Sequence, residues 1–473
     1  MITNAREYQI TKAQRARLEE SLKALQGGQD KSTLTSLGLE IAALQSEINM
    51  LSDQVKAYED LYEGRMAQLE VSGLEALPSV LIKARIASQL SQKDLAERLG
   101  IHMQQVQRYE ATEYRAASFE RMLEIAQLLG VKIQQDVVLA EPLVRKATST
   151  LENWGLTRDF LMTRGIVAGS VEENQPIDAI SSFDRLQHVF GWSTNELERS
   201  QHLRISAEAM GRPHFKLPSG RKQDFVQAYS AYAYRVACGA ARCAEGLPMQ
   251  RVPSDHELAR HQLLQLGPLS LNSIIDWAWG LGIVIIPLRD KGGFNGAFWR
   301  IKGRNVIVLK QQTTSMERVM HDVLHEIYHA SQEPELPTRS VIDAADMMSL
   351  PTDPEEEQAS MFASNVLLNG RANDLVNEVV DIARSYGPAL KGATSKVAQQ
   401  HGVSVGALAN HLAWVLQQQA TPFNWWGVAQ NLQHSHENAL GYVFDVAFSR
   451  LTPPLEPDLD AELLFNALRM EIS

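Results

Sequence analysis

The chain has 473 residues, of which 44% are hydrophobic and 21% are charged, and its formal net charge at pH 7 is −11. This length is enough for several domains, and the negative charge argues against nonspecific binding of nucleic acid or membranes by the whole surface. Cys238 and Cys243 are five residues apart, so on a helix they would point to different faces and make a poor disulfide. Unpaired cysteines fit a reducing cytoplasm. Because the sequence has neither a signal-peptide core nor a membrane-spanning apolar run, we predict a cytoplasmic protein without a membrane partner.

Two helices are predicted within residues 1–73. The first covers residues 11–25, and the second has an apolar residue at alternating steps of four and three. These residues are Leu37, Ile41, Leu44, Ile48, Leu51, Val55 and Tyr58. A heptad seam with Ile and Val at the a positions favours a parallel two-stranded coiled coil, so we predict a dimerisation segment and a homodimer. The alternative is a hairpin in which the second helix folds back on the first.

The next segment, residues 74–135, has the pattern of two short helices joined by a turn. Ser91 and Asp94 cap the first helix, Gly100 turns the chain, and the second helix runs over residues 102–110. The runs LSQKDLAERLG (90–100) and QRYE (107–110) resemble the helix-turn-helix of the Cro and phage-repressor (XRE) family.

That resemblance implies binding to a double-stranded DNA operator. Gln104, Gln105 and Arg108 would reach base edges from the recognition helix, and Gln92 would lie near a phosphate. Residues 80–131 hold seven Lys and Arg against six Asp and Glu, which is a weak electrostatic footprint for DNA. A helix-turn-helix used as a protein-interaction module is therefore the alternative, and a dimer would help by combining two weak half-sites.

Residues 136–252 are predicted as a helical linker or sensor region, because their apolar spacing is mostly helical. Residues 165–176 have the composition of a linker. Basic side chains gather in a Pro- and Gly-containing loop, which fits a solvated loop better than an anion site. They are Arg212, His214, Lys216, Arg221 and Lys222.

A zincin-like arrangement is predicted after residue 269. A helix (269–281) precedes strands at 283–287, 296–301 and 305–309, which we expect to form a small antiparallel sheet. Thr314 and Glu317 then have the spacing of a capping box at the start of the next helix.

This next helix contains His325-Glu326-Ile327-Tyr328-His329, which fits H-E-x-x-H. Residues four apart share one helix face, so His325 and His329 can bind one Zn²⁺, which keeps an open position for water. Glu326 is placed to take the proton of that water. The alternative is two histidines at the edge of an ordinary core, and His321 is interpreted as a supporting or packing residue.

A third ligand is expected from a helix that begins with Asp353 as its cap and Pro354 as its first residue. Glu355 and Glu356 flank its apolar stripe about equally, so periodicity leaves both as candidates. Glu357 points away from that stripe. Acidic residues are also common in a first turn for reasons of the helix dipole alone.

Residues 356–369 resemble a motif of a known family. Together with H-E-I-Y-H, they are similar to the second motif of the ImmA/IrrE metallopeptidases, E-x-x-A-N-x-F-A-x-x-L-L-x-P. The residues aligned with this motif are Glu356, Ala359, Ser360, Phe362, Ala363, Val366, Leu367, Leu368 and Asn369. The resemblance selects Glu356 as the third ligand and places the peptidase domain at residues 253–420. Ser360 and Asn369 depart from the family's usual Asn and Pro.

Residues 421–473 are predicted as a C-terminal helical extension, and residues 402–412 also have a weak helix-turn-helix pattern. We therefore predict a mainly α, multidomain chain with one α+β peptidase domain. By resemblance, its function is that of a DNA-binding transcriptional regulator with a zinc endopeptidase that cleaves a repressor or antitoxin-like protein in a stress or mobile-element response. The alternative is a non-enzymatic, antitoxin-like transcription factor whose peptidase fold serves as a sensing or interaction module.

Overall fold

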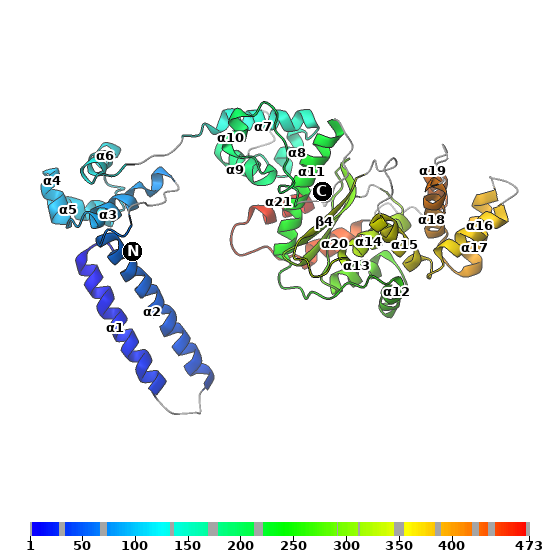
Figure 1. Ribbon diagram of the computed structural model, residues 1–473, viewed down its shortest axis with the longest axis horizontal. Coiled ribbons are helices and arrows are strands. Elements are labelled where there is room, and N and C mark those ends of the chain that lie inside the picture. The colour runs from blue at the N-terminus through cyan, green and yellow to red at the C-terminus, as the bar shows by residue number, and fades with distance from the viewer. Residues whose placement is uncertain are drawn as a thin grey trace. The chain divides into compact units, whose positions relative to one another are not determined.

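The computed structural model of this chain describes twelve segments. They are residues 2–27, 34–66, 73–132, 137–168, 178–211, 221–290, 292–310, 313–344, 354–383, 389–418, 425–433 and 440–469. The chain divides into two compact units, Met1–Val137 and Val138–Ser473 (Figure 1). The predicted helix cap Asp353, most of the predicted linker at 165–176 and the side chains of the basic loop lie outside the described residues.

The first unit is helical throughout its described part. Its elements are α1 (Ala5–Gly27), α2 (Leu34–Tyr62), the 3-10 turn η1 (Leu74–Ala76), α3 (Leu77–Ala87), α4 (Gln92–Leu99), α5 (Met103–Ala111) and α6 (Phe119–Leu128). The helices α1 and α2 lie side by side as an antiparallel hairpin (Figure 1). Tyr8 stacks on Tyr58 with ring centroids 5.0 Å apart, and its hydroxyl donates to Glu59 at 2.6 Å.

This hairpin changes the interpretation of the heptad seam. Ile48, Leu51, Val55 and Tyr58 are buried within a single chain, because α1 folds back along α2. The structure therefore contains the hairpin that was the alternative to a parallel coiled coil. The heptad seam of α2, which favoured a dimer, is explained by packing against α1 of the same chain. The homodimer stays a prediction.

The turn between α4 and α5 has the predicted form. The Ser91 hydroxyl accepts the Asp94 N–H, the Asp94 carboxylate accepts the Ser91 N–H, and Gly100 ends α4 at φ 65°. Because φ is positive there, glycine is the residue that adopts it without strain. Four buried side chains from α3 to α6 form the core of this helical group: Leu81, Leu95, Val106 and Ile125.

A buried ion pair joins α3 to α5, and the sequence analysis did not identify it. Arg85 Nε lies 2.6 Å from Glu110 Oε1, and the two side chains are 3% and 2% exposed. The same guanidinium donates to the carbonyl oxygens of Leu90 and Thr3. Arg85 therefore ties the N-terminal segment and the α3–α4 turn to the recognition helix.

The second unit holds one mixed sheet surrounded by helices. Its strands are β1 (Val284–Pro287), β2 (Phe294–Ile301), β3 (Arg304–Leu309) and β4 (Arg339–Ala344), in the order β1-β3-β2-β4. Its helices are α7 (Ala140–Trp154), α8 (Arg158–Thr163), α9 (Ala179–Phe190), α10 (Thr194–Arg199), α11 (Arg221–Cys243), α12 (His256–Gln265), α13 (Leu271–Gly280), α14 (Met316–Ser331), α15 (Pro354–Leu367), α16 (Ala372–Ala383), α17 (Ala389–His401), α18 (Val405–Gln418), α19 (Trp425–Gln430), α20 (Gly441–Arg450) and α21 (Leu459–Arg469).

The mainly helical fold class and the first three strands are confirmed, but the sheet is not wholly antiparallel. β2 runs antiparallel to both β3 and β4, whereas β1 pairs in parallel with β3. β2 and β3 form a hairpin, β1 lies at the free edge of β3, and β4 lies at the other edge of β2. β4 was not predicted.

The regions on either side of the predicted peptidase domain contribute to the same core. One cluster of buried residues extends from Val144 to Leu468, and α11 packs on β1, β2, β3 and α21. Among the described residues, this cluster includes side chains on both sides of the boundaries predicted near residues 252 and 420, and those boundaries stay predictions. The two cysteines are free, and burial raises the pKa of each to about 11.

The weak helix-turn-helix pattern near α18 does not give a second DNA reader. Residues 406–413 are all buried, and α18 packs against α14. The polar side chains Asn410 and His411 on this helix are 3% and 1% exposed. No helix in the described part of the chain combines the length and the apolar character needed to cross a membrane.

Candidate metal centre

The helix α14 begins one residue later than the sequence indicated. Ser315 is the N-cap and its side chain accepts the Arg318 N–H, so the predicted capping box of Thr314 with Glu317 is wrong. Glu317 is instead buried near α18, where the Ser404 hydroxyl donates to it at 3.3 Å.

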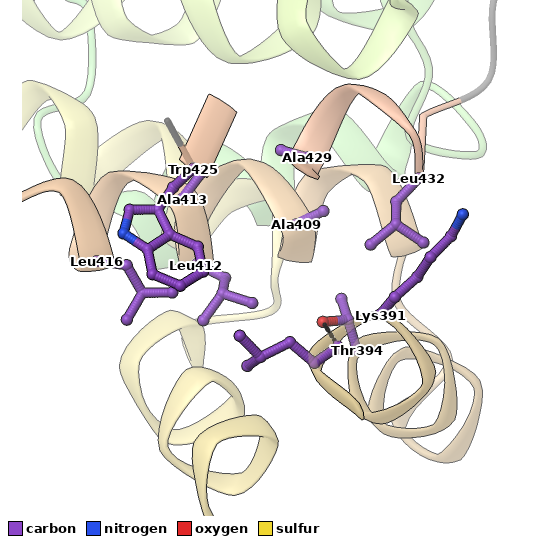
Figure 2. A pocket seen from close by; sticks show the side chains of 10 residues that line it. Lys391, Thr394, Ala409, Leu412, Ala413, Leu416, Trp425, Ala429 and Leu432 are labelled. Carbon is purple, nitrogen blue, oxygen red and sulfur yellow. Dashed lines mark hydrogen bonds between the residues drawn. The ribbon is translucent and has the colours of Figure 1, made fainter. Parts of the chain in front are cut away.

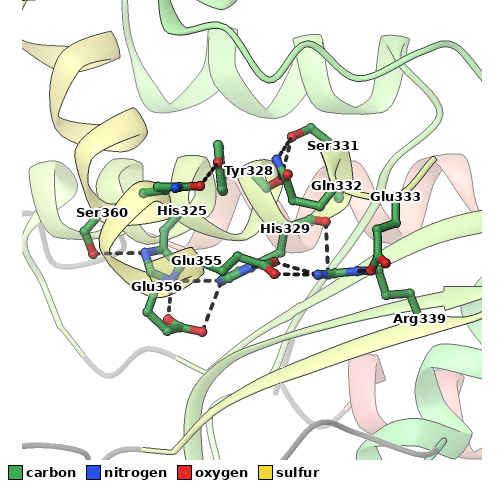
Figure 3. Close-up of polar contacts among 12 residues, drawn as sticks. His325, Tyr328, His329, Ser331, Gln332, Glu333, Arg339, Glu355, Glu356 and Ser360 are labelled. Atoms are coloured by element: carbon green, nitrogen blue, oxygen red, sulfur yellow. Dashed lines mark hydrogen bonds and ion pairs between the residues drawn. The ribbon is translucent and has the colours of Figure 1, made fainter. Parts of the chain in front are cut away.

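The three predicted ligands come together in the second unit. His325 Nε2 lies 3.2 Å from His329 Nε2 and 3.1 Å from Glu356 Oε2, while His329 Nε2 lies 3.4 Å from Glu356 Oε1 (Figure 3). One donor atom from each residue lies within 4.8 Å of the others. Two imidazole nitrogens and one carboxylate are the donor set of a catalytic zinc site with one position left open, so these residues fit that ion.

Packing explains why the histidines converge on α15. Val323, Leu324 and Ile327 are fully buried, which turns the His325 and His329 edge of α14 toward the neighbouring helix. The Ser360 hydroxyl lies 3.3 Å from His325 Nδ1, so this serine contacts a ligand ring at the position where the family motif has Asn.

Glu355, the other candidate for third ligand, contacts the opposite nitrogen of His329. Its Oε1 lies 2.7 Å from His329 Nδ1, and Arg339 Nη2 lies 2.7 Å from both of its carboxylate oxygens. The geometry therefore separates the two adjacent glutamates and places Glu356 within the His325 and His329 group. Arg339 was not found from the sequence, because no local pattern relates a β4 arginine to α15.

Glu326 is 2% exposed and lies against β2. A Cβ atom at Gly296 would be only 2.1 Å from Glu326 Oε1. The strand therefore accommodates this carboxylate because the residue beside it is glycine. Gly296 is a site-forming residue that the sequence analysis did not name.

The electrostatics of the group favour a cation. Burial disfavours protonated His329, but hydrogen bonds to Glu355 and Glu356 and the charge of Glu326 outweigh it and raise the pKa of His329 to about 10. Burial likewise opposes ionisation of Glu355, yet His329 and Arg339 lower its pKa to about 2. Burial opposes ionisation of Glu356 as well, and its contacts with His325 and His329 hold its pKa far below the usual range. In the metal-free chain a proton on His329 therefore supplies positive charge among these carboxylates.

His321 lies outside the group of three ligand atoms. Its Nδ1 is 3.4 Å from Asp322 Oδ1, and its ring centroid is 6.3 Å from that of His325. Burial lowers its pKa. This position fits the interpretation of His321 as a supporting or packing residue.

The residues predicted to bind DNA divide into two kinds. Gln104, Gln105 and Arg108 are exposed on α5, as a reading face requires, and Gln107 is exposed on the same helix. Gln92 instead donates to the buried Glu110 at 2.8 Å. One amide N–H of the half-buried Gln92 is thus engaged within the protein, and the phosphate contact expected for this residue stays a prediction.

Comparison with protein families gives two matches. Residues 81–135 match the family described as Helix-turn-helix, and residues 280–413 match the IrrE N-terminal-like domain. This chain joins a helix-turn-helix domain to an IrrE-like peptidase domain. The IrrE-like match includes α14 and α15, which carry His325, His329 and Glu356. Searches of curated proteins and of solved structures gave no match.

A small pocket elsewhere in the second unit lacks comparable chemistry. Figure 2 shows it between α17, α18 and α19, lined almost entirely by apolar side chains such as Leu412, Leu416 and Trp425. Its hydroxyl, on Thr394, already donates to the Leu390 carbonyl at 2.7 Å. This pocket is a packing feature of α17, α18 and α19.

Proposed function

We propose that this protein is a transcriptional regulator whose IrrE-like domain is a zinc-dependent endopeptidase. The observation that carries the proposal is the convergence of His325, His329 and Glu356 on one small volume. The substrate proposed is a repressor or antitoxin-like protein, cut in a stress or mobile-element response. Its location is proposed as the cytoplasm, where a regulator meets DNA.

The residues that would hold the zinc ion are His325 and His329 through Nε2, and Glu356 through its carboxylate. When bound, the ion would supply Lewis-acid activation of water and of a peptide carbonyl. Glu326 is the general base in this proposal: its buried carboxylate takes a proton from the attacking water and returns it to the leaving amine. Gly296 keeps the space that this carboxylate occupies.

An extended substrate segment has a backbone edge to bind. β4 is an outer strand of the four-stranded sheet, with β2 on one side. A peptide added along its other side would gain main-chain hydrogen bonds without a requirement for one sequence. We propose that β4 aligns the substrate backbone for cleavage.

The helix-turn-helix domain is proposed to bring the protein to a double-stranded DNA operator. Gln104 and Gln105 can pair with adenine and Arg108 with guanine from the exposed face of α5. We further propose a homodimer, because two copies would place two reading helices on two half-sites. Sedimentation of the full-length protein tests this state directly.

The test of the proposed activity is a comparison of two cell populations, one with the wild-type protein and one with Glu326→Gln. A protein fragment that is present in the first and absent in the second identifies the substrate. If the variant keeps its metal and neither the fragment pattern nor any phenotype differs, the protein is a metal-containing binding module and the peptidase proposal fails.

A further inference from the structure

The ligand His329 is held from both sides of its ring. Its Nε2 faces Glu356 Oε1 at 3.4 Å, and its Nδ1 contacts Glu355 Oε1 at 2.7 Å. Both glutamates lie in the first turn of α15, and the His329 side chain is 1% exposed. The ring therefore cannot rotate without losing one of these two carboxylate contacts.

Glu355 is in turn fixed by Arg339, the first residue of β4. Arg339 Nη2 lies 2.7 Å from each oxygen of Glu355, and Arg339 Nε donates to Glu333 Oε2 at 2.8 Å (Figure 3). The Arg339 side chain is 5% exposed. The Glu355 side chain is 31% exposed, so the buried arginine is the more constrained partner of this charge-assisted pair.

The strand β4, which carries Arg339, is linked to the end of α14 through the neighbouring strand β2. Arg339 pairs in register with Arg300 of β2, whose guanidinium donates to the Ala330 carbonyl at 2.7 Å. The Arg300 side chain also donates to the Glu333 carbonyl at 2.6 Å. Two neighbouring strands thus hold the helix end that follows His329.

We propose that Glu355 and Arg339 are positioning residues of the metal centre. Glu355 accepts the Nδ1–H of His329, which leaves the lone pair of Nε2 facing His325 and Glu356. Arg339 engages both oxygens of Glu355, so this carboxylate orients the ligand and does not compete with Glu356 for the ion. The inference rests on the proposed function, since it needs His329 to bind metal.

General experience with metal sites gives the expected size of the effect. Loss of a carboxylate that accepts a hydrogen bond from a ligating histidine weakens metal binding by about 10- to 100-fold. Glu355→Gln keeps an acceptor of the same shape without its charge, whereas Glu355→Ala removes the acceptor. We therefore expect about 10-fold weaker binding for the first and about 100-fold for the second.

The experiment is a zinc titration of the full-length protein at fixed pH in competition with a chromophoric chelator. Glu333→Gln is the matched control, because Glu333 also contacts Arg339 but is 60% exposed and forms no contact with His329 among those described. Its zinc affinity should stay within about twofold of wild type, well below the change expected for Glu355 variants. Arg339→Met should weaken binding as Glu355→Gln does.

Cobalt(II) gives a second readout that a purely structural role would not change. Its visible absorption reports ligand geometry, so Glu355→Gln should shift the spectrum of the cobalt-loaded protein and Glu333→Gln should not. Zinc affinity of Glu355→Ala equal to wild type, or equal losses in Glu355→Gln and Glu333→Gln, overturns the inference. A wild-type protein that binds no zinc overturns the proposed function instead.

Discussion

The metal centre and the DNA-reading face of this chain differ in how their side chains are held. His325, His329 and Glu326 are buried, and neighbouring carboxylates fix the orientation of His329 before any ligand arrives. Gln104, Gln105 and Arg108 project from α5 into solvent. The comparison teaches that the proposed metal site is pre-organised for an ion, whereas the proposed reading face would acquire its order only on binding DNA.

The largest effect should come from the buried base of the metal centre. Glu326→Gln keeps the shape of the side chain and removes its ability to accept a proton, so cleavage should fall by about 10²- to 10⁴-fold. The measurement is the rate of fragment formation from the identified substrate, with metal content determined on the same samples. Cleavage at the wild-type rate would remove Glu326 from the chemistry.

The support beneath the DNA-reading face is buried, unlike the face itself. Glu110→Ala leaves Arg85 without its carboxylate in a site where both side chains are at most 3% exposed. It should lower the free energy of unfolding of the first unit by about 3–5 kcal/mol. Denaturant titration of the full-length protein measures this change.

Glu97→Ala is the control for that titration. Glu97 pairs with Lys93 at 3.7 Å, with both side chains about two-thirds exposed. An exposed pair of this kind contributes about 0–1 kcal/mol, so the unfolding curve should barely move. Equal destabilisation by the two variants would show that the buried Arg85–Glu110 pair contributes no more to the free energy of unfolding than the exposed Lys93–Glu97 pair.

A smaller effect is expected on the reading face. Arg108→Ala should weaken binding to DNA selected from a random library by about 1–3 kcal/mol, because this side chain is free to reach a base edge. Gln92→Ala should change unfolding more than DNA binding, since Gln92 donates to Glu110. Fluorescence anisotropy with the selected duplex measures DNA binding by both variants. A larger loss of binding for Gln92→Ala than for Arg108→Ala would support the predicted contact between Gln92 and a phosphate.

A dependence of metal affinity on pH is also expected. The pKa of His329 is raised to about 10, so its proton is favoured in the metal-free chain and must leave before Nε2 can bind an ion. Zinc affinity should therefore rise by about tenfold per pH unit between pH 7 and 9. An affinity that is constant over this range would show that His329 has an ordinary pKa.

Local patterns in the sequence predicted the elements that carry the sites. H-E-x-x-H, the Ser91 and Asp94 capping box and the strands before α14 depend on neighbouring residues, and the structure contains them. The choice between Glu355 and Glu356 could not come from periodicity, because both flank the same stripe. It required a resemblance, and the structure then places Glu355 beside Nδ1 of His329 and Glu356 beside Nε2 of both His325 and His329.

The contacts that periodicity did not reveal join residues far apart in the sequence. Arg85 and Glu110 are 25 residues apart, and Arg339 lies 16 residues from Glu355. No helical or strand period connects such pairs, and both depend on how the elements pack. The heptad seam of α2 shows the same limit, because its pattern is satisfied equally by a second copy or by α1 of the same chain.

The central claim is that His325, His329 and Glu356 together bind one zinc ion per chain. The most direct test is the metal content of purified full-length protein, measured by mass spectrometry for wild type, Glu356→Ala and the exposed neighbour Glu357→Ala. We predict about one zinc per chain for wild type and Glu357→Ala, and far less than one zinc per chain for Glu356→Ala. Wild-type protein without zinc, or a Glu356→Ala variant that keeps it, would contradict the account.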